Sequence, residues 1–535
     1  MLTATIAVLG LVVTACGGGS GGGAAASFSP TVATTAPSGS KAVDTITWNL
    51  PSGEPSSLDP AMSALESVST VVANMCEPLM RWGDDYQQEP GLATSVDHPN
   101  RTTWVFHLRT GVKFWNGTTM TAADVVYSLK RILDPATASS WAGWAPEGAT
   151  VKATGGDTVT VTVPHYGSAM ESYFATPAFT IVSKAYAQKE GKAFGTAQGG
   201  VMCTGPYQLA SWKSGQSITL KANPNYWDTA DEPAVKTAKF TFVTDQSAQI
   251  AGLQSGDIDG QFTVPVSAYS QLQKAGGHLL FANSLAPTFL SVLDSSGALG
   301  DPKIRQALQK TVDYQGIVDA VYHGAATPLR ALVPPAAWGY AEGVYQAGYD
   351  ALPEPSQDLA AAAALVKRSS RASEKIVLAY TSASTEETKA ATAIADSATS
   401  IGLDVELKPL TAEEFGALFS SAQARKGIDL MLVSGYLDFP DPVTYYQYFT
   451  AGSFYNFNGY SNKRYTALIN AALSEPDEDA KAADVVKAQA IMAKDLINIP
   501  ILTQYVSVYY GKDLGGYLPS QDYLYSPWLA QLGGA

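Results

Sequence analysis

Residues 375–433 alternate between short apolar segments and segments with a helical pattern. The predicted strands are KIVLAY, LDVELK and DLMLV, and the helices between them cover 386–401 and a stretch from about 411. Strands that alternate with helices are typical of α/β layers with mostly parallel pairing. The same order starts at residue 239 with the predicted strand KFTFV, a helix closed by Gly256 and the strand IDGQFTV. The α/β pattern therefore extends over much of the chain.

A chain of 535 residues is too long for one ordinary core, so two or three domains are expected. The patterns divide the body into two α/β regions, 201–287 and 288–500, and a strand-rich insert at about 80–200. Apolar residues make up 46% of the sequence and charged residues 15%. This composition suits a large folded body.

The N-terminus has features of an export signal. Residues 1–16 are apolar but too short to span a bilayer comfortably, and their end, VTAC, is similar to a bacterial lipobox, in which the cysteine receives a lipid. No Lys or Arg precedes residue 41, although a signal peptide usually begins with one. We expect a lipoprotein signal peptide over 1–16 with Cys16 lipidated, and an ordinary cleaved signal is the alternative. The low-complexity residues 17–42 are predicted to form a disordered tether that spans about 30 Å.

Charge and motif content exclude several function classes. The formal net charge is −14, which argues against nucleic acid because phosphate contacts need Lys and Arg. The sequence has no CxxC, Cys/His cluster or HExxH, so neither a metal site nor a cofactor is expected. A G-x-S-x-G match at Gly18 lies in the tether, without the strand and helix that a nucleophile elbow needs. No catalytic constellation is visible, and we expect a protein that is not an enzyme.

Cys76 and Cys203 remain once Cys16 is set aside. In an exported protein they face an oxidising compartment. They either form a disulfide or stay as two buried free thiols, and the residues alone do not decide between these alternatives.

The segment SGYLDFPDP (434–442) follows the predicted strand DLMLV directly. Open α/β sheets bind ligands beyond the carboxyl ends of their strands, and Asp438 lies just past such an end. This position predicts a ligand near Asp438, and the alternative is that Asp438 only caps a turn. The neighbouring prolines limit the freedom of the loop.

Trp141 and Trp144 lie in the Gly-containing segment SSWAGWAPEG. Aromatic rings in such a loop are candidates to stack on a sugar or an aromatic side chain of a ligand. The alternative is that both rings cover the core of the insert.

Five segments together resemble the bacterial extracytoplasmic solute-binding proteins, family 5. They occur in the order of the family's motifs and span about residues 45 to 510. They are the run from CEPLMRW (76–82) to SLKRILDP, CTGPYQLASWKSGQSITLKANPNYWD (203–228), QIAGLQSGDIDG (249–260), DPKIRQALQKTVD (301–313) and DFPDPVTYYQYF (438–449). The family comprises the oligopeptide- and dipeptide-binding components of ABC importers.

The resemblance implies an α/β fold of two lobes, of the periplasmic-binding-protein type (type II, cluster C), that a hinge closes over a ligand. The first lobe would be discontinuous, with 43–78, 201–287 and 495–535, and would carry the strand-rich subdomain 79–200. The second lobe would be 288–494. Both Cys76 and Cys203 then fall in the first lobe, which supports a disulfide between its two halves.

In peptide-binding relatives, an Asp in the W-x-x-Asp-x-x-acid-Pro stretch holds the α-ammonium of the peptide. This Asp corresponds to Asp438 here, and the acid before Pro442 corresponds to Asp441, which resembles loop structure. Tyr436 stands where the usual Trp is expected. The ligand-contacting residues are thus predicted to be Gly435, Tyr436 and Asp438, with Trp141 and Trp144.

The function implied is that of a lipid-anchored, monomeric receptor on the outer face of the cytoplasmic membrane. It would capture a small solute, chiefly a peptide, and deliver it to the permease of an ABC importer. The same fold with an oligosaccharide or a metal chelate as ligand is the alternative. Hypotheses of other classes are a surface hydrolase, for which no nucleophile or metal site is found, and a sensory or adhesive protein.

Overall fold

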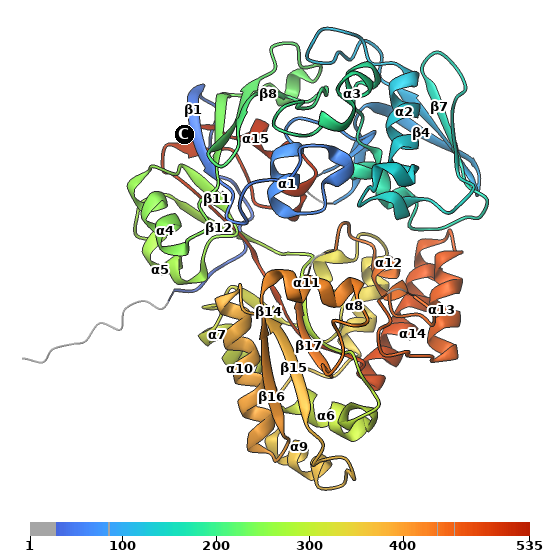
Figure 1. Cartoon of the computed structure of the whole chain (residues 1–535), viewed down its shortest axis with the longest axis vertical. Helices are drawn as coiled ribbons and strands as arrows, with labels where there is room; N and C mark the ends of the chain where they lie inside the picture. The colour runs from blue at the N-terminus through green and yellow to red at the C-terminus, as the bar shows by residue number, and fades with distance from the viewer. Residues whose placement is uncertain (1–27, 84–85, 436, 454) are drawn as a thin grey trace, which may run out of the picture.

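The computed structural model describes residues 28–83, 86–435, 437–453 and 455–535. Two lobes, each built on one large sheet, lie one above the other in Figure 1, and two chain segments pass between them. Cys16 and the predicted signal peptide lie outside the described residues.

The upper lobe contains a seven-stranded sheet with the order β12-β19-β11-β1-β10-β9-β8. Its strands are β1 (Val43–Asn49), β8 (Tyr207–Lys213), β9 (Ser217–Ala222), β10 (Val235–Thr241), β11 (Gly260–Phe262), β12 (His278–Ala282) and β19 (Val506–Tyr510). Its helices are α1 (Glu66–Val72), α4 (Gln246–Ser255), α5 (Tyr269–Leu272) and α15 (Trp528–Gln531). Trp48, from the central strand β1, is fully buried and packs against Trp528 and Phe262, so the C-terminal segment completes this core.

The lower lobe contains a six-stranded sheet with the order β14-β18-β13-β17-β15-β16. Its strands are β13 (Pro287–Val292), β14 (Ala326–Pro328), β15 (Ile376–Thr381), β16 (Val405–Leu410), β17 (Leu430–Ser434) and β18 (Asn498–Gln504). Its helices are α6 (Pro302–Thr311), α7 (Tyr314–Ala320), α8 (Glu342–Asp350), α9 (Leu359–Val366), α10 (Thr385–Ser400), α11 (Ala412–Ser420), α12 (Pro442–Gln447), α13 (Lys463–Leu473) and α14 (Glu478–Asp495). Apolar residues on the two faces of this sheet form two separate cores.

The α/β class is confirmed, but the prediction of mostly parallel sheets is wrong. Among the described strands of the two large sheets, the parallel pairs are β1–β10, β1–β11, β15–β16 and β15–β17, and the other pairs are antiparallel. The antiparallel pairs include the meander β8–β9–β10 and the pair β13–β17. The others are made by β18 and β19, which return from the end of the chain. Local sequence patterns predict where strands lie, but they do not determine which strands pair or in which direction.

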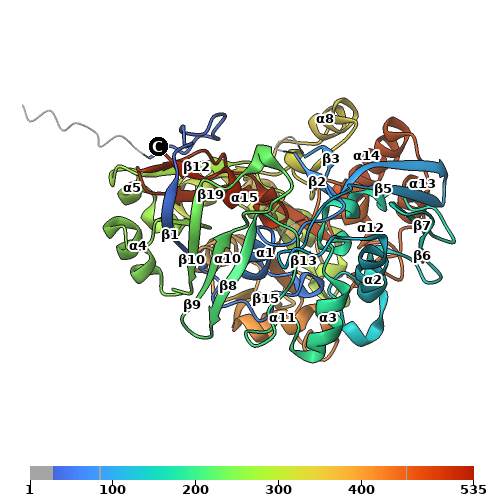
Figure 2. The ribbon, with the colours of Figure 1, turned by 90° about the horizontal axis from the view of Figure 1, so that it is seen from above.

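The strand-rich insert lies at the far end of the upper lobe from the C-terminus, as Figures 1 and 2 both show. It contains β2 (Met80–Trp82), β3 (Gln88–Pro90), β4 (Ala93–Asn100), β5 (Thr103–Leu108), β6 (Thr150–Ala153), β7 (Thr158–Thr162), α2 (Ala122–Leu133) and α3 (Lys184–Glu190). Strands β4, β5, β7 and β6 form an antiparallel sheet. Asp124 accepts hydrogen bonds from Thr121, in the first turn of α2, which fits the interpretation of its sequence pattern as a helix start.

The two crossings between the lobes lie side by side. One is the segment 283–286 between β12 and β13, and the other is Tyr505, the single residue between β18 and β19. Strand β18 pairs with β13 and β14 of the lower sheet. Residues 498–504 therefore belong to the lower lobe, and their predicted place in the upper lobe is corrected, because the last crossing falls at Tyr505.

Residues 28–41 are not the free tether that their composition predicts. Phe28 packs against Tyr269 and Phe281, and Val32 forms a parallel bridge to Phe281 on the edge strand β12. Lys41 pairs with Gly534 near the C-terminus. A few apolar side chains and an open sheet edge are enough to bind this segment, although its composition is poor in apolar residues.

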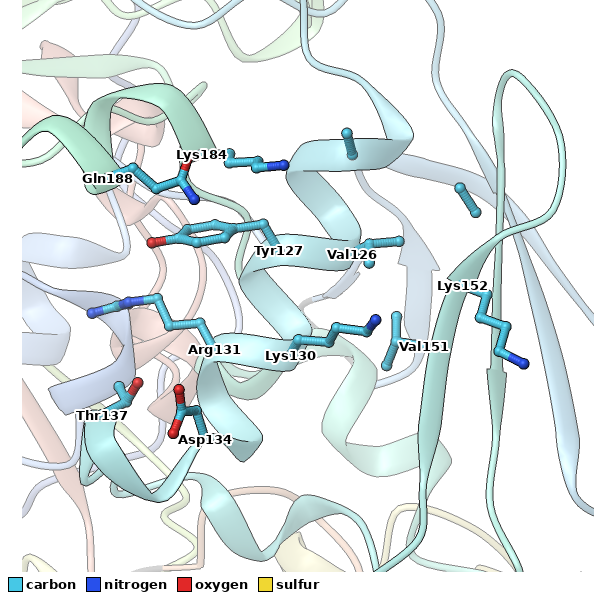
Figure 3. A pocket seen from close by; sticks show the side chains of 12 residues that line it. Val126, Tyr127, Lys130, Arg131, Asp134, Thr137, Val151, Lys152, Lys184 and Gln188 are labelled. Atoms are coloured by element: carbon cyan, nitrogen blue, oxygen red, sulfur yellow. The ribbon is translucent and has the colours of Figure 1, made fainter.

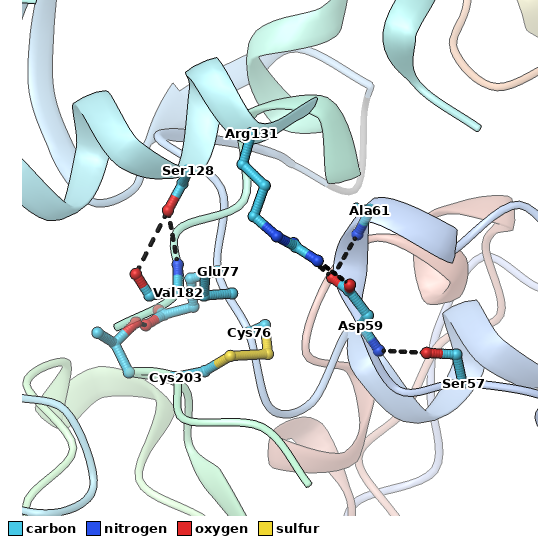
Figure 4. Close-up of a disulfide and its surroundings, with 10 residues drawn as sticks. Ser57, Asp59, Ala61, Cys76, Glu77, Ser128, Arg131, Val182 and Cys203 are labelled. Atoms are coloured by element: carbon cyan, nitrogen blue, oxygen red, sulfur yellow. Dashed lines mark hydrogen bonds and ion pairs between the residues drawn. A yellow bond between two sulfur atoms is a disulfide. The ribbon is translucent and has the colours of Figure 1, made fainter. Parts of the chain in front are cut away.

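Cys76 and Cys203 form a disulfide (Figure 4), as the upper-lobe position of both residues suggested. The bridge joins the end of the α1 region to the residues just before β8, so it links the two halves of the lobe on either side of the insert. Next to it, the buried carboxylate of Glu77 accepts hydrogen bonds from Thr204, Tyr226 and Trp227. Burial raises the pKa of Glu77, and these donors oppose the rise.

Candidate functional site

Asp438 lies in the loop that follows β17, at the border between the two lobes. The loop is tied to the crossing segment before β13, because the backbone N–H of Leu437 donates to the carbonyl of Leu285 at 3.2 Å. The hydroxyl of Tyr525, from the upper lobe, donates to Oδ1 of Asp438 at 2.8 Å. Tyr436, predicted to contact ligand, lies outside the described residues.

Aromatic rings surround Asp438. A small cavity of about 30 Å³ beside it is lined by Leu437, Asp438, Phe439, Asp441, Thr444, Tyr445 and Tyr448, and Tyr173 of the insert packs edge-on against Phe439 at 4.9 Å between ring centroids. Burial raises the pKa of Asp438, and the bond from Tyr525 lowers it. Burial and the nearby Asp438 and Asp441 raise the pKa of Tyr173 to about 12. No Lys or Arg forms an ion pair with Asp438 in the part of the chain that the structure describes.

Asp441 has a different role from Asp438. It is the N-cap residue of α12, where its side chain accepts from the N–H of Val443. Tyr340 and Ser172 also donate to it, and burial raises its pKa while the nearby Lys481 lowers it. This fits the interpretation of Asp441 as loop structure, since its bonds hold the helix start and the loop together.

A larger cavity of about 240 Å³ lies between the two sheets, next to the crossings. It is lined by Glu66, Thr263, Ser284, Ala286, Thr288, Ser434, Gly435, Gln504, Tyr505, Val506, Ser507, Gln521, Tyr523 and Leu524. Gly435 is thus placed on the cleft, together with residues such as Glu66 and Tyr523 that the sequence did not single out. These residues come from both lobes and lie far apart in the chain, so no local sequence motif predicts that they line one cavity.

Trp141 and Trp144 are not on this cavity. They are 5% and 3% exposed and belong to the core of the upper lobe and insert. Trp141 donates through its indole N–H to the carbonyl of Ser63 at 2.9 Å and packs edge-on against Tyr525. Trp144 packs against Phe179. Of the two alternatives for these rings, the structure therefore favours the covering of the core, with Trp141 supporting the tyrosine that bonds Asp438.

The lobes also touch at the side away from the crossings. The N–H of Ser168 donates to the carbonyl of Leu473 at 2.9 Å, and Arg101 donates to the carbonyl of Ser474. Gln87 donates to the carbonyl of Gly339 at 3.1 Å. The insert therefore closes one end of the cleft against the end of α13 and the residues before α8.

A more voluminous groove, of about 760 Å³, lies elsewhere (Figure 3). It is a groove over the outer face of α2 with the side chains of Lys130, Lys152 and Lys184 at its borders. All its lining residues lie between 123 and 188, so it belongs to the insert alone. We assign the ligand site to the smaller cavity between the lobes, despite the greater volume of this groove. A cleft between two lobes can enclose a ligand, whereas the groove is open on the surface of the insert.

Glu387, near the N-terminus of α10, is a buried carboxylate next to Ser434 on the cleft. Burial raises its pKa to about 7, the nearby Glu386 adds to the rise, and a bond with Ser434 opposes it. The folded protein therefore binds a proton at Glu387 that the unfolded chain has lost, between an ordinary pKa of 4.5 and about 7.

We expect the free energy of unfolding to fall as the pH rises through this window, by roughly 3 kcal/mol from this group. Glu387→Gln should remove that fall, while Glu386→Gln should keep most of it. Urea unfolding at pH 5 and pH 8 measures both. Equal pH dependence in the wild type and Glu387→Gln would contradict the assignment.

Within the described residues, no helix is long and apolar enough to cross a membrane. The sequence is similar to those of peptide-binding proteins from Bacillus subtilis. It is 27% identical to the dipeptide-binding protein DppE of Bacillus subtilis over 475 residues, 84% of each chain. It is 28% identical to the oligopeptide-binding protein OppA of the same organism over 499 residues, 86% of this chain and 88% of OppA.

Solved structures agree on the fold. The substrate-binding protein CtaP of Listeria monocytogenes superposes with a TM-score of 0.81 at 23% identity, covering 92% of this chain and 100% of CtaP. The family model for bacterial extracellular solute-binding proteins, family 5, matches residues 87–457. The match covers most of the insert, strands of both large sheets and the Asp438 loop. The chain therefore belongs to the bacterial extracellular solute-binding proteins of family 5.

Proposed function

We propose that this protein captures peptides in the interlobe cleft, holds their free amino group at Asp438, and delivers them to the permease of an ABC importer. The single observation that carries the peptide assignment is the environment of Asp438. A carboxylate among aromatic rings, with a neutral hydroxyl as its bonded partner, is poorly compensated when the cleft is closed. A ligand ammonium supplies both the missing charge and hydrogen bonds.

The relatives support this choice. DppE and OppA carry the names of dipeptide- and oligopeptide-binding proteins. The aromatic faces near Asp438 add a favourable surface for a cation. An oligosaccharide or a metal chelate remains the alternative ligand class, and the burial of Trp141 and Trp144 removes the two rings first considered for sugar stacking.

A lipid on Cys16 would hold the protein, as a monomer, at the outer face of the cytoplasmic membrane. Residues 28–41 run along the sheet edge and the C-terminus, so this part of the predicted tether is bound to the upper lobe. In this proposal the protein binds and releases its ligand without changing it.

The test is a thermal-shift and calorimetry screen of the purified protein. Di- to pentapeptides with a free amine should raise the melting temperature by about 2–3 °C at 100 times their Kd, because binding to the native state stabilises it by about 2.7 kcal/mol. Maltooligosaccharides and nickel–histidine complexes serve as comparison ligands. Stabilisation by these compounds and by none of the peptides would overturn the peptide assignment.

A further inference from the structure

A second carboxylate lies in the cleft, and neither the family motif nor the site around Asp438 includes it. Glu66 begins α1, which lies on the face of the upper lobe that points to the lower lobe (Figure 1). It lines the interlobe cavity together with Ser434 and Gly435, which precede Asp438 in the chain. Glu66 and the start of the Asp438 loop therefore border the same cavity, while Asp438 itself lines the smaller cavity described above.

The partners of Glu66 are neutral hydroxyl groups. Oε1 accepts from Thr263 at 2.5 Å and from Tyr523 at 2.9 Å, and Oε2 accepts from Ser52 at 2.9 Å. No Lys or Arg is found among the lining residues of the cavity or the bonded partners of Glu66 in the described chain. The carboxylate is held in a fixed orientation, and its charge is left without a counter-ion.

Thr263 is in a strained conformation. Its φ is 51°, in the left-handed region that a β-branched residue adopts at a cost. Its backbone N–H donates to the carbonyl of Ser507 while its hydroxyl reaches Glu66. Such strain concentrates at ligand-binding positions, where the surrounding structure maintains it. The conformation of Thr263 is thus a second observation, independent of the charge of Glu66, that points to ligand binding at this end of the cavity.

The charge of Glu66 selects the kind of ligand group that fits this end of the cavity. A lysine or arginine side chain has an aliphatic stem and a charged end, and that end can pair with the half-buried carboxylate of Glu66. A neutral or acidic side chain would leave this carboxylate without a counter-ion when the cleft closes.

We propose that Glu66 binds the cationic side chain of a basic residue in the captured peptide, so that the cleft prefers basic peptides. This inference rests on the proposed peptide-binding function. Gly435 and Asp438 are three positions apart in the sequence, which places their Cα atoms at most about 10 Å apart. A peptide held by its amine at Asp438 and extended at about 3.3 Å per residue presents its second to fourth side chains at this distance.

The experiment measures binding of pentapeptides with an alanine background and one lysine or one norleucine at position two, three or four. Norleucine keeps the aliphatic stem and removes the charge. Isothermal titration calorimetry with the full chain should give a roughly 10- to 100-fold lower Kd for lysine at one position. In Glu66→Gln this preference should disappear, with the norleucine peptides little affected.

Glu54→Gln is the matched control, since Glu54 also accepts side-chain and backbone hydrogen bonds in the upper lobe but does not line the cavity. It should keep the preference for lysine. Glu66→Lys should favour the same peptide with glutamate in place of lysine. Retention of the lysine preference in Glu66→Gln, or equal weakening of lysine and norleucine peptides, would overturn the proposal and leave peptide binding intact. Failure of every free-amine peptide to bind would overturn the proposed function itself.

Discussion

Asp438→Asn should weaken the binding of free-amine peptides by roughly 10- to 100-fold, while N-acetylated forms of the same peptides should be little affected. The amide keeps an oxygen that can accept the hydrogen bond from Tyr525, so the loop should stay in place. What is lost is the charge that pairs with the ammonium, and a charge-assisted bond contributes about 1.5–3 kcal/mol. Calorimetric titration of each peptide pair measures the effect.

Asp441→Asn is the control for this experiment. Asp441 lies three residues further on and caps α12. The amide oxygen of Asn can still accept from the N–H of Val443, so the melting temperature should change little and the discrimination between free and acetylated amines should be kept. An equal loss of affinity for both peptide forms in Asp438→Asn would show that Asp438 does not hold the amine.

Removal of the disulfide by Cys76→Ala with Cys203→Ala should lower the free energy of unfolding by about 5 kcal/mol. The bridge closes a loop with a sequence separation of 127 residues, and in the chain-entropy model a loop of this size restricts the unfolded state by about that amount. We expect a decrease in melting temperature of about 5 °C, measured by calorimetry.

A reducing agent provides the matched test. It should lower the melting temperature of the wild type toward that of the double variant and have no effect on the variant itself. A reductant-induced decrease of equal size in both proteins would contradict a stabilising role for the bridge. Ligand affinity of the double variant below its melting temperature should be close to that of the wild type, because neither cysteine lines the cleft.

Much of the fold follows from local patterns. The strands KIVLAY, LDVELK and DLMLV correspond to β15, β16 and β17 within two residues, and the helix predicted over 386–401 corresponds to α10. Gly256 has a φ of 81° at the end of α4, as the stop signal of that helix requires. These elements carry strong periodic or capping signals, which depend on residues close in sequence.

Strand partners and lobe membership could not be predicted in the same way. The mainly apolar pattern of residues 498–504 would suit a strand in either lobe. Their pairing with β13 follows from the position at which the chain crosses between the lobes. Phe28 and Val32 bind a sheet edge that exists only in the folded protein. The pairing of strands that are far apart in sequence depends on the tertiary structure, and a local sequence pattern contains little information about it.

The residues of the site likewise include one that the sequence predicts and one that only the tertiary structure brings to light. Asp438 was found because a family motif and the end of a strand coincide there. Glu66 has no motif around it, and its importance depends on Thr263 and Tyr523, which lie about 200 and 450 residues away in the chain. The local sequence around Glu66 carries no distinctive pattern that would predict a site.

The structure of the protein in complex with its tightest-binding peptide tests the central claim most directly. We predict that the peptide lies between the two sheets, with its amino nitrogen about 2.7–2.9 Å from a carboxylate oxygen of Asp438. A peptide bound outside the interlobe cleft, such as in the groove over α2, or one whose amine lies far from Asp438, would contradict it.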